Sequence, residues 1–244
     1  MQITTFPIVL ENTYMASPQV KHFVFKCSHS PAFNYLPGQF ITILFEHEGK
    51  PLRRSYSIAN APKQDNRIEF AAGYVAGGPG TDLLFNLNQG DTIQIMGPFG
   101  RLILKEEIPN RYILVSTSTG VTPYRAMLME LQKRLENHPE LHIVVLQGVQ
   151  KREDVLHKED FLALAKQFPN VQFKAHLSRE SAENLAAHEA IGYVQTAFPS
   201  LALDPKHDLV YLCGNPGMID DAFNYLKEQG FAMQQIIREK YISK

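Results

Sequence analysis

Hydrophobic and polar positions follow one rhythm in the N-terminal part of the chain and another in the C-terminal part. Up to about Lys105, short apolar runs rich in aromatic and β-branched residues are separated by Gly and Pro. This pattern predicts short antiparallel strands that form a small Greek-key β-barrel. The predicted strands are Val20–Lys26, Phe40–Phe45, Ser55–Ala59, Arg67–Tyr74 and Thr92–Met96, and one helix is predicted at Thr81–Leu87.

After about Pro109, continuous apolar runs alternate with segments whose leucines recur at helical spacing, as Leu128, Leu131 and Leu135 do. Alternation of strands and helices is typical of a parallel sheet covered by helices on both faces. The predicted strands are Tyr112–Ser116, Leu141–Leu146, Val171–Leu177 and Leu209–Cys213, and the helices are Pro123–Leu135, Phe161–Gln167 and Met218–Gln229. We therefore predict two domains, a β-barrel at residues 1–105 and an α/β domain at residues 110–244.

Composition and charge are those of an ordinary globular protein, with 44% hydrophobic residues, 20% charged residues and a net charge of -1. This balance does not favour a nucleic-acid or membrane partner. Two cysteines cannot supply the four ligands of an iron–sulfur cluster, so any such cluster in the pathway would reside on another protein. The nine histidines include no H-E-x-x-H motif of the kind that binds zinc, and we expect no metal site. With no signal peptide and no apolar run of about 18 residues, we expect a cytoplasmic location. The expected oligomeric state is a monomer, although the sequence says little about it.

The segment Arg54-Ser55-Tyr56-Ser57 offers a guanidinium, a phenol and two hydroxyls within four positions. In an extended strand, Arg54 and Tyr56 project to one face and Ser57 to the other. Arginine pairs with phosphate in a fork, tyrosine stacks on flat rings and serine donates one hydrogen bond. The segment therefore suits a flat ligand that carries a diphosphate. An ordinary strand with a surface arginine and a half-buried tyrosine is the alternative.

Two strand-to-helix loops of the second domain could also bind a ligand, because ligands of parallel sheets bind beyond the carboxyl ends of the strands. The loop at Ser116–Pro123 contains Gly120, which lets the backbone approach a ligand, and a proline suited to the first helical turn. The loop at Cys213–Met218 places a cysteine at a strand end before another helix. The alternatives are a polar turn without a ligand and a buried cysteine that acts as a small hydrophobic residue.

Two further segments could bind phosphate. Gly78–Thr81 leads into the predicted barrel helix and could form an anion-binding turn. Ser178 and Arg179 follow a predicted strand and could bind a phosphate through charge-assisted hydrogen bonds. A plain turn and a surface arginine are the respective alternatives.

In their order along the chain, these segments resemble the ferredoxin–NADP reductase superfamily, and the resemblance spans nearly the whole sequence. The segments that carry it are Arg54–Ser57, Gly78–Thr81, Gly97–Gly100, Thr119–Pro123, Cys213–Met218 and Glu239–Tyr241. Members of this family join a flavin-binding antiparallel barrel to a nicotinamide-nucleotide domain, so the resemblance implies that two-domain fold. One departure is Ser118, where the family commonly has glycine.

The resemblance implies FAD as the flavin cofactor. Arg54 would bind the diphosphate, Tyr56 would stack on the isoalloxazine, and Ser57 would lie near flavin N5. Tyr241 would match the aromatic residue that shields the flavin, although three residues follow it. The expected FAD contacts are Arg54, Ser55, Tyr56, Ser57, Pro79, Gly80, Thr81 and Tyr241.

The resemblance also implies a nicotinamide nucleotide. Cys213 would lie beside the nicotinamide ring, Glu239 would supply a carboxylate near the site of hydride transfer, and these two with Ser57 form the expected catalytic set. Ser178 and Arg179 occupy the place where NADP-specific members hold the 2′-phosphate, which favours NADPH over NADH. The expected NADP contacts are Thr119, Gly120, Pro123, Ser178, Arg179, Cys213, Gly214 and Met218.

The implied function is that of an FAD-dependent oxidoreductase. It would transfer a hydride between NADP(H) and the flavin, and single electrons to or from a ferredoxin or flavodoxin. One alternative is a reductase that releases free reduced flavin, and Tyr56 argues mildly against it because a stacked tyrosine favours retention. Another alternative is a non-catalytic electron-transfer subunit of a larger complex.

Overall fold

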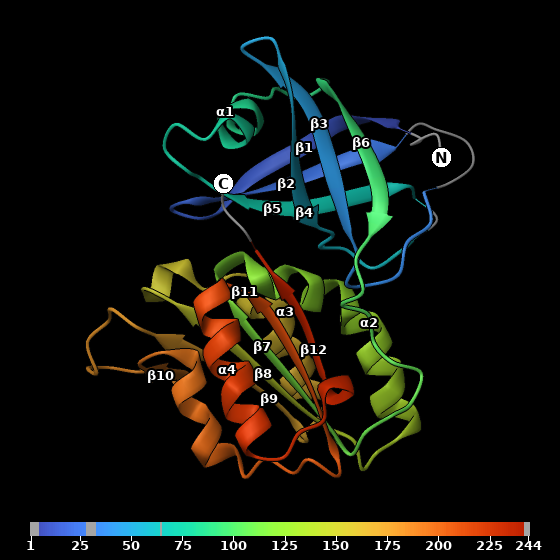
Figure 1. The fold of residues 1–244 in the computed structure, drawn as a ribbon. Coiled ribbons are helices and arrows are strands. Elements are labelled where there is room, and N and C mark those ends of the chain that lie inside the picture. Colours follow the sequence, from blue (N-terminus) through green and yellow to red (C-terminus); the bar gives the residue numbers. More distant parts are fainter. Residues whose placement is uncertain (1–4, 28–32, 64, 242–244) are drawn as a thin grey trace. The chain divides into compact units, whose positions relative to one another are not determined.

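The structure is a computed structural model, and it describes residues 5–27, 33–63 and 65–241. The chain forms two compact units, one of Met1–Ile103 with Thr122–Met127 and the other of Leu104–Val121 with Leu128–Lys244. The elements of the first unit are β1 (Phe6–Ser17), β2 (Val20–Cys27), β3 (Phe40–His47), β4 (Lys50–Ser57), β5 (Arg67–Gly73), α1 (Pro79–Phe85) and β6 (Thr92–Phe99) (Figure 1).

The strands of the first unit form an antiparallel sheet in the order β4-β3-β6-β1-β2-β5. An isolated antiparallel bridge between Ile58 and Phe70 joins the segment that follows β4 to β5, the strand at the other edge of the sheet. This bridge brings the two outer strands together, so the sheet curls into a barrel with little free edge. The predicted antiparallel barrel is confirmed.

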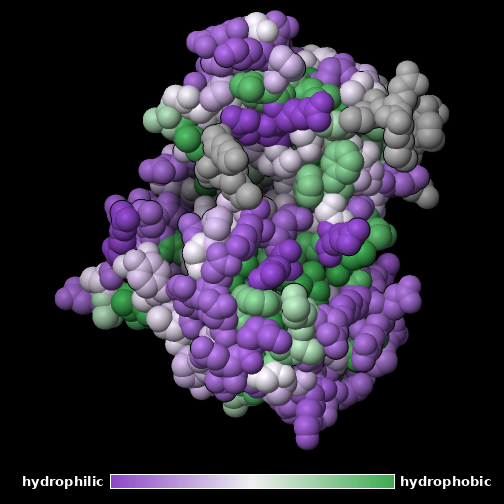
Figure 2. All heavy atoms as spheres, viewed as in Figure 1, coloured by the Kyte–Doolittle hydropathy of each residue, from purple (hydrophilic) through white to green (hydrophobic). Residues whose placement is uncertain are grey.

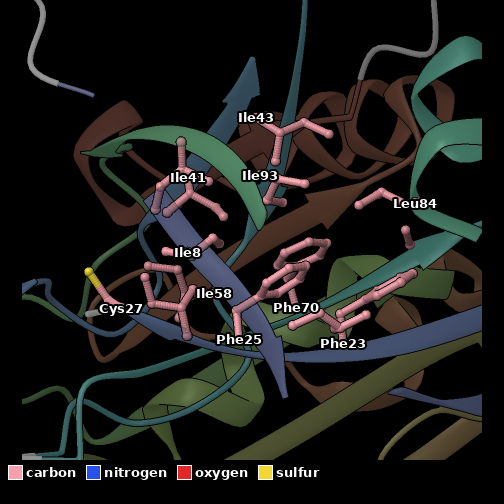
Figure 3. Close-up of a cluster of buried hydrophobic side chains, with 14 of the residues drawn as sticks. Ile8, Phe23, Phe25, Cys27, Ile41, Ile43, Ile58, Phe70, Leu84 and Ile93 are labelled. Carbon is pink, nitrogen blue, oxygen red and sulfur yellow. The ribbon is translucent and has the colours of Figure 1, made fainter. Parts of the chain in front are cut away.

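Aromatic and branched side chains from several strands fill the barrel. Figure 3 shows Phe23, Phe25 and Phe70 gathered with isoleucines from β1, β3 and β6. The Phe70 ring stacks on Phe23 at 5.3 Å and on Phe25 at 5.4 Å between centroids. All three phenylalanines are fully buried. Offset stacking adds to the burial of these large rings, so the barrel has a continuous aromatic core.

Two strand predictions for the barrel need correction. β1 was absent from the prediction, because register shifts near Glu11 and Ala16 interrupt the alternation of buried and exposed positions. β4 begins at Lys50 rather than at Ser55. The residues Lys50-Pro51-Leu52-Arg53 look like a charged turn, but β4 is an outer strand of the sheet, where proline and charge are tolerated.

The second unit is a parallel sheet in the order β10-β9-β8-β7-β11-β12 (Figure 1). Every residue of β11 is buried, as expected for a central strand with both faces covered. The predicted parallel α/β architecture is confirmed. The strands and helices of the C-terminal part are β7 (Arg111–Thr117), α2 (Thr122–Asn137), β8 (His142–Val149), α3 (Lys158–Gln167), β9 (Val171–Leu177), β10 (Glu189–Ile191), β11 (Asp208–Gly214), α4 (Pro216–Glu228) and β12 (Ile236–Lys240). The first residues of α2, Thr122–Met127, belong to the first unit.

Helical segments pack against the sheet through apolar side chains. A 3-10 helix, η3 (Val194–Leu201), and α4 share one buried cluster with β7, β8 and β11. From α3, Phe161 stacks on Phe173 of β9 with centroids 5.3 Å apart. The sequence did not predict β10 and β12, because each is short and carries mixed polar residues at the edge of the sheet.

Hydrophilic residues cover most of the face in Figure 2, with smaller hydrophobic areas among them. This surface agrees with the composition, because most large apolar side chains are used in the two cores. Within the described part of the chain, no helix combines the length and apolar character needed to cross a bilayer.

Phe70→Ala should destabilise the protein by about 3–5 kcal/mol, because it removes a fully buried ring and leaves a cavity among three stacked partners. Chemical denaturation of the purified variants would measure the free energy of unfolding. Phe99→Ala is the matched control, since that ring is 40% exposed and should cost less than about 1 kcal/mol. Equal losses for the two variants would contradict this account of the core.

Candidate functional site

Arg54, Tyr56 and Gly80 come together in the first unit. A Cβ atom built on Gly80 would overlap the Arg54 side chain and lie 3.5 Å from the Tyr56 hydroxyl. The first turn of α1 therefore packs against the face of β4 that carries the arginine and the tyrosine. Glycine at this position lets the backbone approach both side chains closely.

Tyr56 has one ring face fixed by the barrel core. Its ring stacks on Phe70 with centroids 5.0 Å apart, and the residue is partly exposed. Burial raises the pKa of the phenol to about 12, although the nearby Arg54 guanidinium lowers it. The phenol is thus neutral at physiological pH and gives a flat, rigid surface next to a cation.

The turn Gly78–Thr81 is organised by the Thr81 hydroxyl. That hydroxyl lies within hydrogen-bond distance of the carbonyl oxygens of Val75 and Gly78, and it accepts a hydrogen bond from the Val75 N–H. Pro79 starts α1. Thr81 is buried, so its oxygen shapes the turn rather than standing open to a ligand.

The two serines of the Arg54–Ser57 segment differ in their surroundings. Ser55 shares a 2.9 Å hydrogen bond with the Thr42 hydroxyl on the neighbouring strand. Ser57 is only 5% exposed and pairs with Phe40 in the β3–β4 register. Ser55 is therefore bound to the sheet, while Ser57 lies in the buried end of β4.

In the second unit, the loops after β7 and β11 pack directly against each other. A Cβ atom on Gly120 would overlap the carbonyl oxygen of Cys213, and one on Gly214 would overlap the Thr117 side chain. Gly214 has a φ of +123°, which side chains other than glycine rarely adopt. The two predicted loops are thus one assembled structure at the carboxyl ends of two neighbouring parallel strands.

The Cys213 thiol is fully buried in this loop pair. Burial raises its pKa well above the usual value, the Glu239 carboxylate raises it further, and a hydrogen bond with the Tyr241 side chain lowers it. Glu239 faces Cys213 in the β11–β12 register, and the Tyr241 N–H donates to the Gly214 carbonyl at 2.8 Å. The thiol therefore stays protonated and acts as an uncharged packing group.

Two residues that order this loop pair were missed from the sequence. The Thr117 hydroxyl accepts a 2.8 Å hydrogen bond from the Asn215 N–H across the two loops. The Asn215 side chain accepts from the N–H groups of Gly217 and Met218, so it is the N-cap of α4. Asn before Pro-Gly is a recognisable helix-start signal, but the Thr117 contact joins distant parts of the chain and has no local signal.

Ser118, which stands where the family commonly has glycine, has a strained backbone conformation. Its φ is +47°, in the left-handed region that favours glycine. The residue is exposed and lies at the start of the short 3-10 helix η1 (Ser118–Val121). The loop keeps this conformation with serine, at a strain of order 1 kcal/mol.

The remaining predicted contacts of the first nucleotide loop lie at the start of α2. Thr119 is half-buried in η1, and Pro123 occupies the first turn of α2, which begins at Thr122. Met218 lies in the first turn of α4, but its side chain belongs to the hydrophobic core beneath the loop. Met218 can therefore contact a ligand through its backbone more readily than through its side chain.

Ser178 and Arg179 lie just beyond the end of β9. The Ser178 hydroxyl and N–H both donate to the Val149 carbonyl, and the Arg179 N–H donates to Gln150 at 2.8 Å. The Arg179 side chain is exposed and forms no ion pair with any residue in the described ranges. This guanidinium is therefore available for an anion next to a fixed strand end.

Tyr193 is a third residue that the sequence did not single out. Tyr193 lies two residues after the end of β10. Gly192, which precedes it, donates its N–H to the Leu177 carbonyl at the end of β9. Its side chain is 67% exposed, the largest exposure among the large hydrophobic residues described. An exposed ring near Arg179 is a suitable stacking surface for a purine.

The residues present fit the cofactors that the resemblance implies. On the first unit, Gly80 lets the start of α1 pack against a guanidinium and a neutral phenol, because a Cβ there would overlap the Arg54 side chain. On the second unit, two glycine-bearing loops meet at the strand ends where nucleotides bind. Each unit thus has a site suited to a ligand that combines flat rings with phosphate groups.

Comparison with protein families matches each unit separately. An oxidoreductase FAD-binding domain matches residues 7–103, and an oxidoreductase NAD-binding domain matches residues 114–223. A solved ferredoxin NADP⁺ reductase from Neisseria gonorrhoeae, with bound FAD and NADP, superimposes with a TM-score of 0.83. That match covers 98% of this chain and 99% of the other at 22% identity, so it shows a shared fold.

Curated relatives identify the family. Ferredoxin–NADP reductase B of Sorangium cellulosum (strain So ce56) is 30% identical over 210 residues, which cover 83% of each chain. Ferredoxin–NADP reductase of Azotobacter vinelandii is 27% identical, over 87% of this chain and 85% of its own length. The toluate 1,2-dioxygenase electron transfer component of Pseudomonas putida is 28% identical, and the match spans 59% of its length. The chain therefore belongs to the ferredoxin–NADP reductase superfamily of FAD- and NAD(P)-binding oxidoreductases.

Proposed function

We propose that this protein is an FAD-dependent oxidoreductase that takes a hydride from NADPH and passes single electrons to a separate ferredoxin or flavodoxin. The observation that carries the proposal is the assembly of both half-sites, with Gly80 against Arg54 and Tyr56, and Gly120 against Cys213. Relatives from Sorangium and Azotobacter are named ferredoxin–NADP reductases, which supports this choice of partner. A cytoplasmic location and a monomeric state stay predictions from the sequence.

FAD, when bound, would supply the chemistry by accepting a hydride and releasing its electrons one at a time. In the first unit, Arg54 would neutralise the diphosphate, and the backbone around Pro79 and Gly80 would hold it. Tyr56 would present a ring whose other face is fixed by Phe70, which orients a flat cofactor at little entropic cost. Ser57, in the buried end of β4, would offer its hydroxyl near the reacting part of the flavin.

In the second unit, the loop pair would orient the nicotinamide nucleotide. Gly120 and Gly214 keep the two loops close enough for the backbone to line a ligand, and Thr117 and Asn215 fix their spacing. The uncharged Cys213 thiol would pack beside the ring and exclude water, and Glu239 is the carboxylate adjacent to it. Tyr241 lies against Cys213, so its contact with the flavin stays a prediction.

Binding of the nucleotide's other end would involve Ser178, Arg179 and Tyr193. An exposed guanidinium without an ion-pair partner among the described residues suits a 2′-phosphate, and an exposed ring beyond the adjacent strand suits the adenine. This arrangement supports NADPH rather than NADH as the reductant.

A second candidate is the reductase component of an oxygenase system. It is favoured by relatives named as the toluate 1,2-dioxygenase electron transfer component and the phenol hydroxylase P5 protein of Acinetobacter pittii (strain PHEA-2). The matches span 59% and 57% of those proteins. Kinetics with each class of acceptor separates this candidate from the ferredoxin or flavodoxin reductase.

The proposed activity predicts that the purified protein binds FAD and oxidises NADPH with a dye acceptor. It also predicts faster turnover with ferredoxin or flavodoxin than with free FMN, because Tyr56 favours retention of the flavin. Steady-state kinetics with these acceptors, together with a dilution test of FAD retention, would check both points. Loss of FAD at nanomolar protein, with free flavin as the best acceptor, would favour the flavin-releasing reductase instead.

Cys213→Ala should slow reduction of bound FAD by NADPH by roughly tenfold to a hundredfold, about 1.4–2.7 kcal/mol, because the ring loses a packing partner that orients it. Single-turnover measurements of the flavin absorbance would report this rate, and the spectrum of bound FAD should not change. Cys27→Ala is the matched control, since Cys27 is equally buried but lies in the barrel core. An unchanged rate in Cys213→Ala would refute the role of this thiol.

Arg179→Ala should raise the KM for NADPH by at least about tenfold and leave the KM for NADH nearly unchanged, because a charge-assisted hydrogen bond to phosphate is worth about 1.5–3 kcal/mol. Steady-state kinetics with both nucleotides would measure the two effects. Lys133→Ala removes an exposed charge on α2 and should affect neither. Equal effects of Arg179→Ala on NADPH and NADH would remove the 2′-phosphate assignment.

A further inference from the structure

A cavity of about 360 Å³ lies along one flank of the second unit, on the face of β8, β9 and β10 that η3 covers. It is separate in position from the loops after β7 and β11, none of whose residues line it. The residues that line it are Leu146, Gln172, Lys174, His176, Ala190, Ile191, Thr196, Ala197, Ser200 and Leu201.

His176 is the unusual member of this lining. The residue is only 5% exposed, and neither ring nitrogen has a hydrogen-bond partner among the described residues. Burial, aided by the charge of Lys174, lowers the pKa of the imidazole to about 4, so the ring is neutral at physiological pH. A neutral imidazole has one donor and one acceptor, and leaving both unused in a buried place is costly. A ligand could supply the missing partner.

The charges around the cavity favour an anion. Lys174 is exposed at its edge and forms no ion pair with the part of the chain that the structure describes. No aspartate or glutamate is among the lining residues. The hydroxyls of Thr196 and Ser200 donate to the carbonyls of Tyr193 and Ala197 at 2.6 and 2.7 Å, so their protons are already used within η3. The lysine is therefore the main group in the lining that can attract a charged ligand.

Apart from Gln172, the rest of the wall is apolar, and the volume is small. Leu146, Ile191 and Leu201, with two alanines, provide hydrocarbon surface next to the lysine and the imidazole. Small-molecule sites combine such walls with a few polar groups in about 300–1,000 Å³. The cavity lies at the lower end of this range, which limits the ligand to a compact body such as one ring or a short chain.

We propose that this cavity binds a small organic carboxylate whose apolar body fills the space between β9, β10 and η3. The carboxylate would pair with the Lys174 ammonium, and a rotation about χ2 of His176, which is a broad torsion, would turn a ring N–H towards it. The site does not depend on the proposed redox function. It would be a separate binding site on the flank of the nucleotide domain.

Benzoate is a suitable probe, because it has one ring and one carboxylate. In a titration of the ¹⁵N-histidine-labelled full chain at constant ionic strength, the His176 ring resonances should shift with saturation. Sodium chloride in place of benzoate should leave them unshifted. Saturating NADP⁺ should leave the benzoate affinity unchanged, because none of Ser178, Arg179 and Tyr193, and no residue of the loops after β7 and β11, lines the cavity.

Two variants test the named contacts. Lys174→Ala should weaken benzoate binding by at least about tenfold, whereas Lys166→Ala, an exposed lysine on α3, should not change it. His176→Phe should also weaken binding, because it fills part of the cavity and removes the ring N–H. If His176→Phe does not fold, Lys174→Ala still tests the proposal, because Lys174 is exposed and its replacement should not affect folding.

Three results would overturn the proposal. One is the absence of a saturable shift with benzoate, and another is an equal loss of affinity in Lys174→Ala and Lys166→Ala. Competition between benzoate and NADP⁺ is the third, because it would assign the cavity to the nucleotide site.

Discussion

The close approach of two backbone loops at the carboxyl ends of β7 and β11 is the constraint on which the proposed nucleotide site depends. Gly120 meets the Cys213 carbonyl where no side chain would fit, and the Thr117 hydroxyl binds the Asn215 N–H from the other loop. Asn215 then caps α4, so one polar residue connects the loop geometry to the start of a helix. The role proposed for Cys213, to pack beside the nicotinamide ring, requires this backbone packing. The thiol is uncharged and buried, so only its position can matter.

In the barrel, the proposed flavin site depends on a rigid aromatic surface rather than on two packed loops. Its aromatic core extends through Phe70 to the Tyr56 ring, so the stacking surface is an outward continuation of the core. Rigid support of this kind reduces the entropy lost when a flat ligand binds. Gly80 lets the first turn of α1 pack against Arg54 and Tyr56, and the Thr81 hydroxyl holds that turn in place. Both half-sites therefore combine a fixed ring or thiol with a glycine that lets another segment of the protein pack closely.

Much of the fold could be predicted from local pattern. The change from short, punctuated strands to alternating strands and helices indicated the barrel and the parallel sheet, because each architecture imposes its own period of buried positions. The misses have physical causes. Bulges interrupt the alternation in β1, and outer position lets β4 carry Lys50 and Pro51. β10 and β12 are too short to show a period.

For the site, the sequence by itself determined the residue types and their order, from Arg54 and Tyr56 to Cys213 and Glu239, because chemistry and chain order are local properties. Only the tertiary structure decided which of them meet and in what state. Burial keeps the Cys213 thiol neutral, because it raises the pKa of that group. The Met218 side chain lies in the core, whereas Arg179 is exposed. The contact of Thr117 with Asn215 and the cavity beside His176 arise from residues distant in sequence, and no local pattern encodes such meetings.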